Sequence, residues 1–348
     1  MKSFVKIFVV FLLFPFLSCE YIQKRIDISS IKDMKQEIFA DFQTGDPKRL
    51  KTFIDSIDTG DDTKPLFLDE IRISKRKSWS LKKVVKADLI EELISFPSLL
   101  SKDILGDSAR FYTYRISDFK DSKTILWIPG FGVSDMAFHL IKNIFIEELK
   151  HGYNVVVYIP PYHLERRLPD KDDGVGFFSA DMQKNLFTSF EQLREIRTIN
   201  LFLKKQGVKE ISSWGGSMGA STLLLSSKFT NYEHICLMIP LLDWYTAVFD
   251  SEYFKPLVDS LFVYGFDSLS IAGTLKKMSP ENYQLPLKPG NMFVQYAKYD
   301  QLSSERVIQA FIKKNNITKV KSYNTSHATI LLSRSVYKDY ASFLDSVN

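Results

Sequence analysis

The stretch "SSWGGSMGAS", residues 212 to 221, places three glycines and other small residues around Ser217. Its central part, Gly215-Gly216-Ser217-Met218-Gly219, has the pattern G-x-S-x-G. A strand-like run precedes it and a helical stretch begins at Met218, and a serine at such a turn projects its Oγ outward. Side chains two residues before or after that serine would collide, so both positions must be nearly bare. The stretch therefore predicts a nucleophilic serine, with a plain glycine turn as the alternative.

On either side of Ser217, short apolar runs rich in β-formers alternate with helical stretches. Such alternation is typical of a doubly wound α/β core with a mostly parallel sheet. The predicted strands are Arg110 to Ile116, Thr124 to Ile128, Asn154 to Ile159, Glu210 to Trp214, His234 to Ile239, Met292 to Ala297 and Lys319 to Tyr323. The predicted helices are Ala137 to Lys150, Ala180 to Lys205, Met218 to Lys228, Ser304 to Lys314 and Ser335 to Val347.

Two regions interrupt this alternation, so the predicted core consists of residues 108–240 and 290–348. Residues 19–107 are charged and mixed in pattern, and we expect an N-terminal extension that contributes helices and edge strands. A strand-like run within it spans Leu66 to Ser74. Residues 241–289 form an aromatic-rich amphipathic insertion, which is either a lid over the strand ends or an extra set of packed helices.

A nucleophilic serine needs a base and an acid, which in this kind of fold follow it in the order serine, acid, histidine. Of the five histidines, only His327 follows a suitable acid, and it lies in a polar loop between the last predicted strand and the last helix. Asp300 ends the strand run "MFVQYAKYD" and is the predicted acid. Asp243, which follows the preceding strand, is the alternative. Capping of a helix is the competing role for Asp300.

The run "WIPGFGVSD" follows the strand Thr124 to Ile128 and has glycines where backbone must approach a substrate closely. We predict an oxyanion hole formed by the backbone N–H groups of Met218 and Phe131, with Gly130 and Gly132 beside the substrate. A simple turn is the alternative for the two glycines.

Taken together, these residues resemble the α/β-hydrolase superfamily from about Ala109 to the C-terminus. The resemblance implies a mostly parallel eight-stranded sheet. It also implies hydrolysis of an ester, thioester or amide without a metal or an organic cofactor. Independently, no histidine pair has a recognised metal-ligand spacing.

A second resemblance concerns the segment Pro161 to Arg167, "PYHLERR". It is similar to a P-Y-x-x-x-R-[KR] segment of a poorly described branch of hydrolase-domain proteins, although Leu168 precedes Pro169 here. Tyr162 and Arg166 are therefore predicted to bind substrate, since an arginine can hold a phosphate or carboxylate with two hydrogen bonds. The alternative is a surface ion pair with Glu165, Asp170 or Asp172.

The first residues, "MKSFVKIFVVFLLFPFLSCE", have a lysine-bearing start and an apolar run too short to span a bilayer. They predict a signal peptide over residues 1–18. The run Phe16-Leu17-Ser18-Cys19 resembles the lipobox of bacterial lipoproteins, so we expect Cys19 to carry a lipid that anchors an exported protein to an envelope membrane, on its periplasmic or surface side. An ordinary secretory signal is the alternative.

The net charge of +5 is small for 348 residues and the basic residues are scattered among acids, which argues against nucleic acid as a partner. The pattern predicts a serine hydrolase whose substrate is a hydrophobic or lipid-like acyl compound. Acyl transfer by the same residues and a non-catalytic binding lipoprotein are the alternatives. Nothing in the sequence indicates an oligomeric state.

Overall fold

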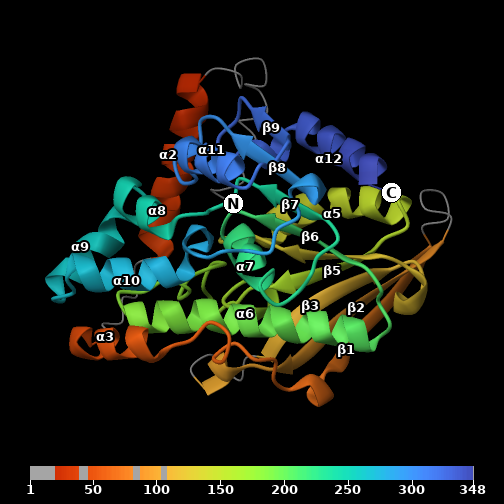
Figure 1. Cartoon of the computed structure of the whole chain (residues 1–348), viewed down its shortest axis with the longest axis horizontal. Helices are drawn as coiled ribbons and strands as arrows, with labels where there is room; N and C mark the ends of the chain where they lie inside the picture. Colours follow the sequence, from red (N-terminus) through yellow and green to blue (C-terminus); the bar gives the residue numbers. More distant parts are fainter. Residues whose placement is uncertain (1–19, 39–45, 81–86, 103–107, 348) are drawn as a thin grey trace.

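The computed structural model describes residues 20–38, 46–80, 87–102 and 108–347. The predicted signal peptide and Cys19 lie outside these residues. One nine-stranded sheet runs through the described chain in the order β1-β2-β3-β5-β4-β6-β7-β8-β9 (Figure 1). Its strands are β1 (Arg72–Ser80), β2 (Asp88–Pro97), β3 (Ser108–Arg115), β4 (Thr124–Ile128), β5 (Asn154–Ile159), β6 (Ile211–Gly216), β7 (Ile235–Met238), β8 (Met292–Ala297) and β9 (Lys319–Tyr323).

Six neighbouring strands, β5, β4, β6, β7, β8 and β9, pair in parallel, whereas β1, β2 and β3 form an antiparallel edge joined to β5. The predicted mostly parallel α/β sheet is confirmed, with nine strands in place of eight. The strand that the sequence did not reveal is β2. Its apolar run is interrupted by Glu91 and Glu92. Glu92 is buried in the sheet, where Arg115 of β3 donates to its carboxylate at 3.0 Å and offsets the cost of burying the charge.

Helices cover both faces of the sheet because neighbouring residues of a strand point to opposite sides. In β4, Ile125 and Trp127 pack with α5 and α12, while Leu126 and Ile128 pack with α6, α7 and α11. Outside the insertion, the α-helices of the described residues are α2 (Glu20–Ile38), α3 (Pro47–Ser56), α5 (Asp135–Lys150), α6 (Met182–Lys205), α7 (Met218–Ser226), α11 (Glu305–Lys314) and α12 (Arg334–Val347). Among the described helices, none is long and apolar enough to cross a membrane.

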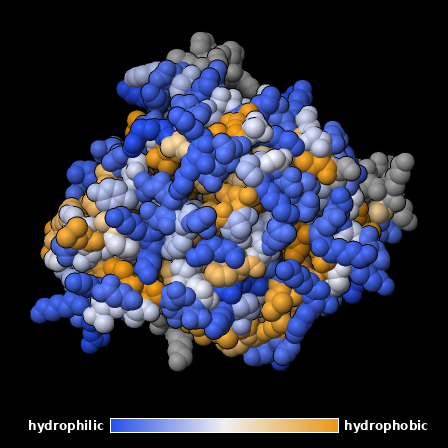
Figure 2. Space-filling model, in the orientation of Figure 1, coloured by the Kyte–Doolittle hydropathy of each residue, from blue (hydrophilic) through white to orange (hydrophobic). Residues whose placement is uncertain are grey.

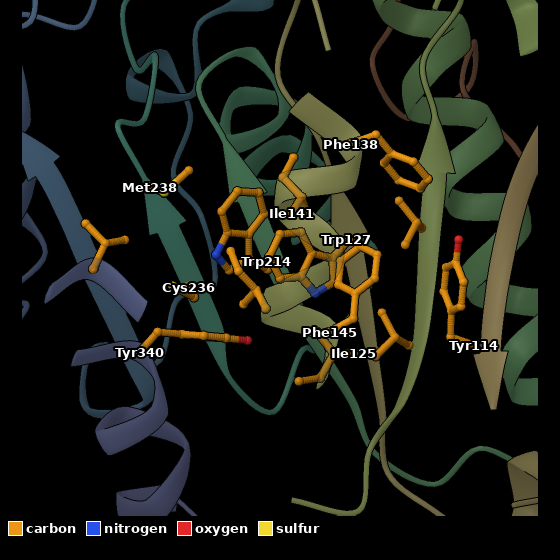
Figure 3. Close-up of a cluster of buried hydrophobic side chains, with 14 of the residues drawn as sticks. Tyr114, Ile125, Trp127, Phe138, Ile141, Phe145, Trp214, Cys236, Met238 and Tyr340 are labelled. Carbon is orange, nitrogen blue, oxygen red and sulfur yellow. The ribbon is translucent and has the colours of Figure 1, made fainter. Parts of the chain in front are cut away.

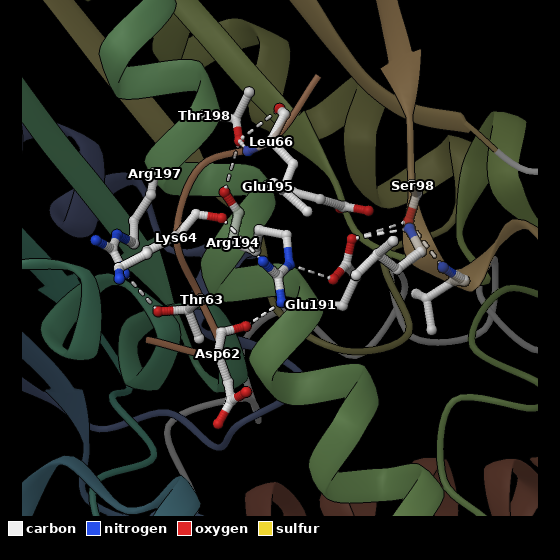
Figure 4. Close-up of polar contacts among 12 residues, drawn as sticks. Asp62, Thr63, Lys64, Leu66, Ser98, Glu191, Arg194, Glu195, Arg197 and Thr198 are labelled. Carbon is white, nitrogen blue, oxygen red and sulfur yellow. Dashed lines mark hydrogen bonds and ion pairs between the residues drawn. The ribbon is translucent and has the colours of Figure 1, made fainter. Parts of the chain in front are cut away.

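The segment before β1 is tied to α6 by arginines of that helix (Figure 4). Arg194 donates from Nη1 to the carbonyl of Lys64 at 2.9 Å, and Arg197 donates to the hydroxyl of Thr63 at 2.7 Å. The predicted strand Leu66 to Ser74 is only partly correct. Phe67 has a left-handed φ of 59° and begins the short 3₁₀ helix Leu68–Glu70, so the strand starts only at Arg72.

The insertion forms three α-helices, α8 (Trp244–Asp250), α9 (Lys255–Val263) and α10 (Ser268–Met278). Trp244 and Phe254 pack against Phe178 in one aromatic cluster, with ring centroids 5.5 Å from that of Phe178. At the α9–α10 end, Val263 and Leu269 are more than four-fifths exposed. Figure 2 shows apolar side chains gathered on that side of the molecule.

Candidate active site

Ser217 lies between the end of β6 and the start of α7, in a strained conformation with φ 49° and ψ −120°. The glycines of the motif make this turn possible. A Cβ on Gly219 would lie 2.0 Å from the carbonyl oxygen of Ile128, and one on Gly215 would lie 2.9 Å from the Cα of Ala220. A side chain at either position would therefore clash with backbone atoms and displace the turn, as the sequence pattern indicates.

The structure brings Ser217, His327 and Asp300 into one hydrogen-bonded series. His327 Nε2 lies 3.0 Å from Ser217 Oγ, and His327 Nδ1 lies 2.8 Å from Asp300 Oδ2. The carboxylate of Asp300 is almost fully buried, while the imidazole remains partly accessible. With Nδ1–H donated to Asp300, Nε2 is the acceptor that faces the serine hydroxyl.

Asp300 is itself held by the loop that it begins. Its Oδ1 accepts the backbone N–H groups of Leu302 and Ser303, each at 2.8 Å. The helix-capping role considered for Asp300 does not apply in this form, because α11 begins only at Glu305. One carboxylate oxygen orders the loop and the other orients the histidine.

A second buried carboxylate, that of Asp27 in α2, lies beside the loop that carries His327. It accepts the backbone N–H of His327 at 3.0 Å and that of Ala328 at 2.9 Å. Burial disfavours the charged form of His327, but the carboxylates of Asp300 and Asp27 outweigh it and hold the pKa of His327 above its ordinary value. The pKa of Asp27 is also raised, chiefly by burial, against the opposing effect of the Ala328 N–H and the His327 charge.

The loop after β4 lies beside the serine. A Cβ on Gly130 would be 3.0 Å from the Cβ of Ser217, so backbone alone fits there. The N–H of Gly132 donates to Nε2 of His163 at 2.8 Å, and Nδ1 of that histidine bonds to the carbonyl of Pro161. Burial lowers the pKa of His163 to about 4, so the ring is neutral at pH 7, with its proton on Nδ1.

Because the Gly132 N–H already donates to His163, the backbone N–H groups of Phe131 and Met218 are the candidate oxyanion donors. Met218 is the first residue of α7, and the first N–H groups of a helix have no acceptor within it. The helix dipole favours negative charge at the same point.

A cavity of about 200 Å³ opens beside Ser217 and His327, and its walls are mostly apolar. Trp214, Ile141 and Met238 belong to the hydrophobic core and also line it; Figure 3 shows these side chains within that core. The other lining residues are Asp27, Gly130, Phe131, Gly132, Val133, Ala137, Gly216, Ile239, Leu302, Ala328 and Leu331. Among the described residues that line it, none comes from the insertion.

Two predicted substrate contacts are placed elsewhere. Arg166 is fully buried and pairs with Glu195 of α6, at 2.8 Å from Nη1 and 3.0 Å from Nη2. It therefore forms neither a contact with the cavity nor the surface ion pair that was the alternative. Tyr162 is buried in the aromatic cluster near Phe177 and does not line the cavity either. Both side chains make their contacts within the protein core.

The alternative acid is also placed away from the histidine. Asp243 is the N-cap of α8, where it accepts the N–H of Tyr245 at 2.9 Å and the hydroxyl of Thr246 at 2.5 Å. Asp300 is the acid that reaches His327.

The sequence did not reveal the roles of Asp27 and His163. Asp27 lies in a charged segment with no motif, about 300 residues from its partners, so no local pattern could have identified it. His163 had a weak signal, since it stands within the quoted segment Pro161 to Arg167. Within the described part of the chain, no three His, Cys, Asp or Glu side chains are grouped as metal ligands would be.

Comparisons with known proteins identify the fold. No family model and no curated protein matches the sequence. Among solved structures, an S-formylglutathione hydrolase from Agrobacterium tumefaciens is similar with a TM-score of 0.54 at 11% identity, over 80% of this chain and all of that one. A cold-adapted esterase from an Arctic intertidal metagenomic library has a TM-score of 0.50 at 12% identity, over 79% of this chain and 96% of the esterase. The chain has the α/β-hydrolase fold, as its sequence predicts.

Proposed function

We propose that the protein is a serine hydrolase that cleaves carboxylic esters. The observation that carries this proposal is the position of His327, whose two ring nitrogens lie 3.0 Å from Ser217 Oγ and 2.8 Å from Asp300 Oδ2. A base within hydrogen-bond distance of a nucleophile, and itself oriented by an acid, is the arrangement that activates a serine.

In the proposed mechanism, Oγ of Ser217 attacks the ester carbonyl carbon as His327 Nε2 takes the hydroxyl proton. The negative charge forms on the carbonyl oxygen, where the N–H groups of Met218 and Phe131 stabilise it. His327 then gives the proton to the leaving alcohol. A water molecule, deprotonated by the same nitrogen, then attacks the acyl carbon. The bond between that carbon and Ser217 Oγ breaks, His327 returns the proton to Oγ, and the carboxylic acid leaves.

The cavity supports a hydrophobic acyl group, because aromatic and aliphatic side chains form most of its walls. Its volume of about 200 Å³ is small beside the 300–1,000 Å³ of typical ligand sites. We therefore expect short acyl chains to fit best. A lipid-like substrate would have to extend beyond this cavity.

The test is turnover of p-nitrophenyl esters from acetate to palmitate, together with labelling by a fluorophosphonate. Ser217→Ala should remove both, with at least a 10⁴-fold loss of kcat expected from the behaviour of such triads. Ser227→Ala is the matched control, since it removes the same hydroxyl at the far end of α7, and it should keep both. Turnover that persists in Ser217→Ala would refute the proposal.

Residues 1–19 lead to a second proposal, on location. Their pattern supports export and lipid attachment at Cys19, which would hold the chain at an envelope membrane. Replacement Cys19→Ser should move the protein from the membrane to the soluble fraction and leave the turnover of soluble esters unchanged. If the protein stays with the membrane in Cys19→Ser, lipidation of Cys19 is not the anchor.

A further inference from the structure

Helix α2 lies against both of the loops that carry the base and the acid of the site. The link is Asp27, a residue that is only 1% exposed. Its Oδ2 accepts the backbone N–H of His327 at 3.0 Å and that of Gln301 at 3.2 Å, and its Oδ1 accepts the N–H of Ala328 at 2.9 Å. Gln301 directly follows Asp300, so one carboxylate joins the two loops.

Gln23 lies one helical turn earlier, on the same face of α2. Its Oε1 accepts the N–H of Ser326 at 3.1 Å and the hydroxyl of Thr329 at 2.5 Å. Like Asp27 it is almost fully buried. The loop on both sides of His327 is therefore bound to α2 through side-chain acceptors.

The charge of Asp27 acts on the same histidine. Among the described residues, the ionisable groups that act on the pKa of His327 are Asp300, from the loop after β8, and Asp27, from α2. Two carboxylates close together repel each other, and Asp300 contributes to the raised pKa of Asp27. A neutral acceptor would avoid this repulsion, but an amide offers only one acceptor oxygen. The Asp27 carboxylate offers two acceptor oxygens, and these accept the backbone N–H groups of Gln301, His327 and Ala328.

We propose that Asp27 is a positioning residue, which fixes the His327 loop against the Asp300 loop and favours the positively charged imidazole during the reaction. This rests on the proposed ester hydrolysis. Its physical basis is that hydrogen bonds from N–H groups to a buried carboxylate are strong, and that a small displacement of a base from its nucleophile lowers the rate about 10²-fold.

The test compares three variants of the full chain. Asp27→Asn removes the charge and replaces one acceptor with a donor. Gln23→Ala removes the neighbouring acceptor without a change of charge. Glu20→Gln is the matched control, because it removes an acid from the exposed start of the same helix, where Glu20 pairs only at the surface with Lys24.

Two readouts do not depend on turnover. Hydrogen–deuterium exchange of residues 300–303 and 325–329 reports how firmly the loops are held, and NMR titration reports the pKa of His327. For Asp27→Asn we expect faster exchange in both loops and a lower pKa of His327, since a nearby negative charge favours the protonated ring. Gln23→Ala should show faster exchange in residues 325–329 with a much smaller change of pKa, and Glu20→Gln neither effect.

Kinetics complete the test. The base must be neutral to accept the serine proton, so activity rises with pH through the pKa of His327. In Asp27→Asn the acid limb of kcat/KM should move to lower pH, and kcat at pH 7 should fall about 10- to 100-fold with a smaller change in KM.

The proposal is overturned if the exchange of both loops and the pKa of His327 in Asp27→Asn equal those in Glu20→Gln. Absence of serine-dependent turnover would refute the proposed function instead, and the exchange and titration results would still decide the role of Asp27.

Discussion

Asp300 and Glu195 are both buried carboxylates paired with a basic side chain, yet their surroundings differ. Asp300 lies in a loop, and its partner His327 borders the cavity and is partly exposed. Glu195 lies on α6, and its partner Arg166 is fully buried and also donates to the carbonyl of Ile159 at 2.9 Å. In the proposed function the first pair exchanges a proton with a bound molecule, whereas the buried second pair holds two segments of the chain together. Both acids are buried, so burial of the acid does not distinguish the two pairs. They differ in the exposure of the basic side chain to the cavity or the solvent.

The largest effect on activity is expected at the first pair. Asp300→Asn should lower kcat about 10⁴-fold, because an amide no longer fixes the proton on Nδ1 or balances the charged imidazole. The melting temperature should change little. Steady-state kinetics and thermal unfolding check both statements.

The matched control for Asp300→Asn is Asp243→Asn, which alters only the N-cap of α8 and should leave kcat within a few-fold of the unaltered chain. If the control lost more activity than Asp300→Asn, the acid would have to be reassigned to Asp243.

At the second pair the effect should be on stability. Glu195→Ala leaves the Arg166 charge buried without its main partner and should lower the free energy of unfolding by about 3–5 kcal/mol. The kcat of the folded protein should stay near its normal value. Urea unfolding measures the loss.

The double substitution Arg166→Met with Glu195→Met should recover most of that stability, because apolar side chains of similar size can replace a buried ion pair. Loss of kcat in proportion to Ser217→Ala would show instead that this pair takes part in the reaction.

Glu148 is another buried carboxylate, and within the described part of the chain no cationic side chain hydrogen-bonds to it. Glu148 accepts from Trp127 Nε1 at 2.7 Å and from the hydroxyl of Tyr340. Burial raises its pKa to about 8, against the opposing effect of these two donors. Between about pH 5 and pH 8 the folded chain therefore binds a proton that the unfolded chain has released.

Stability should accordingly fall with rising pH across that window, by about 1 kcal/mol per pH unit for this group. Glu148→Gln should remove that slope. Urea unfolding at pH 5.5, 6.5 and 7.5 measures it, and an equal slope in both proteins would show that Glu148 is ionised when folded.

The sequence predicted the parts of the molecule that follow local rules. The strand bounds of β4, β5, β8 and β9 agree with the runs predicted from β-rich apolar sequence. Ser217 was predicted because its turn needs bare neighbours, and Asp300 and His327 because of their chain order and their places after strand ends. The structure brings the three side chains within hydrogen-bond distance.

What the sequence could not predict depends on contacts between distant segments. Asp27 meets the His327 loop across 300 residues, and nothing in its own helix indicates that partner. Arg166 forms an ion pair with Glu195 in the core, so the expectation that an arginine near a strand end faces solvent or substrate was wrong. In each case a polar side chain is buried because another segment supplies the opposite charge or the hydrogen-bond donors.

A smaller effect on kcat is expected at His163. Burial lowers the pKa of this histidine, whereas the neighbouring carboxylates raise that of His327. The neutral ring of His163 accepts the Gly132 N–H and so holds the loop that carries Phe131. His163→Leu removes the acceptor and should lower kcat about 10-fold, as the loop no longer holds the Phe131 N–H at the developing charge. His163→Gln keeps a side-chain acceptor and should retain more activity than His163→Leu. Equal kcat in the two variants, both near the normal value, would show that the loop is held by its packing alone. In that case Gly174 would be the residue to examine, because a Cβ there would lie 2.9 Å from the ring of Phe131.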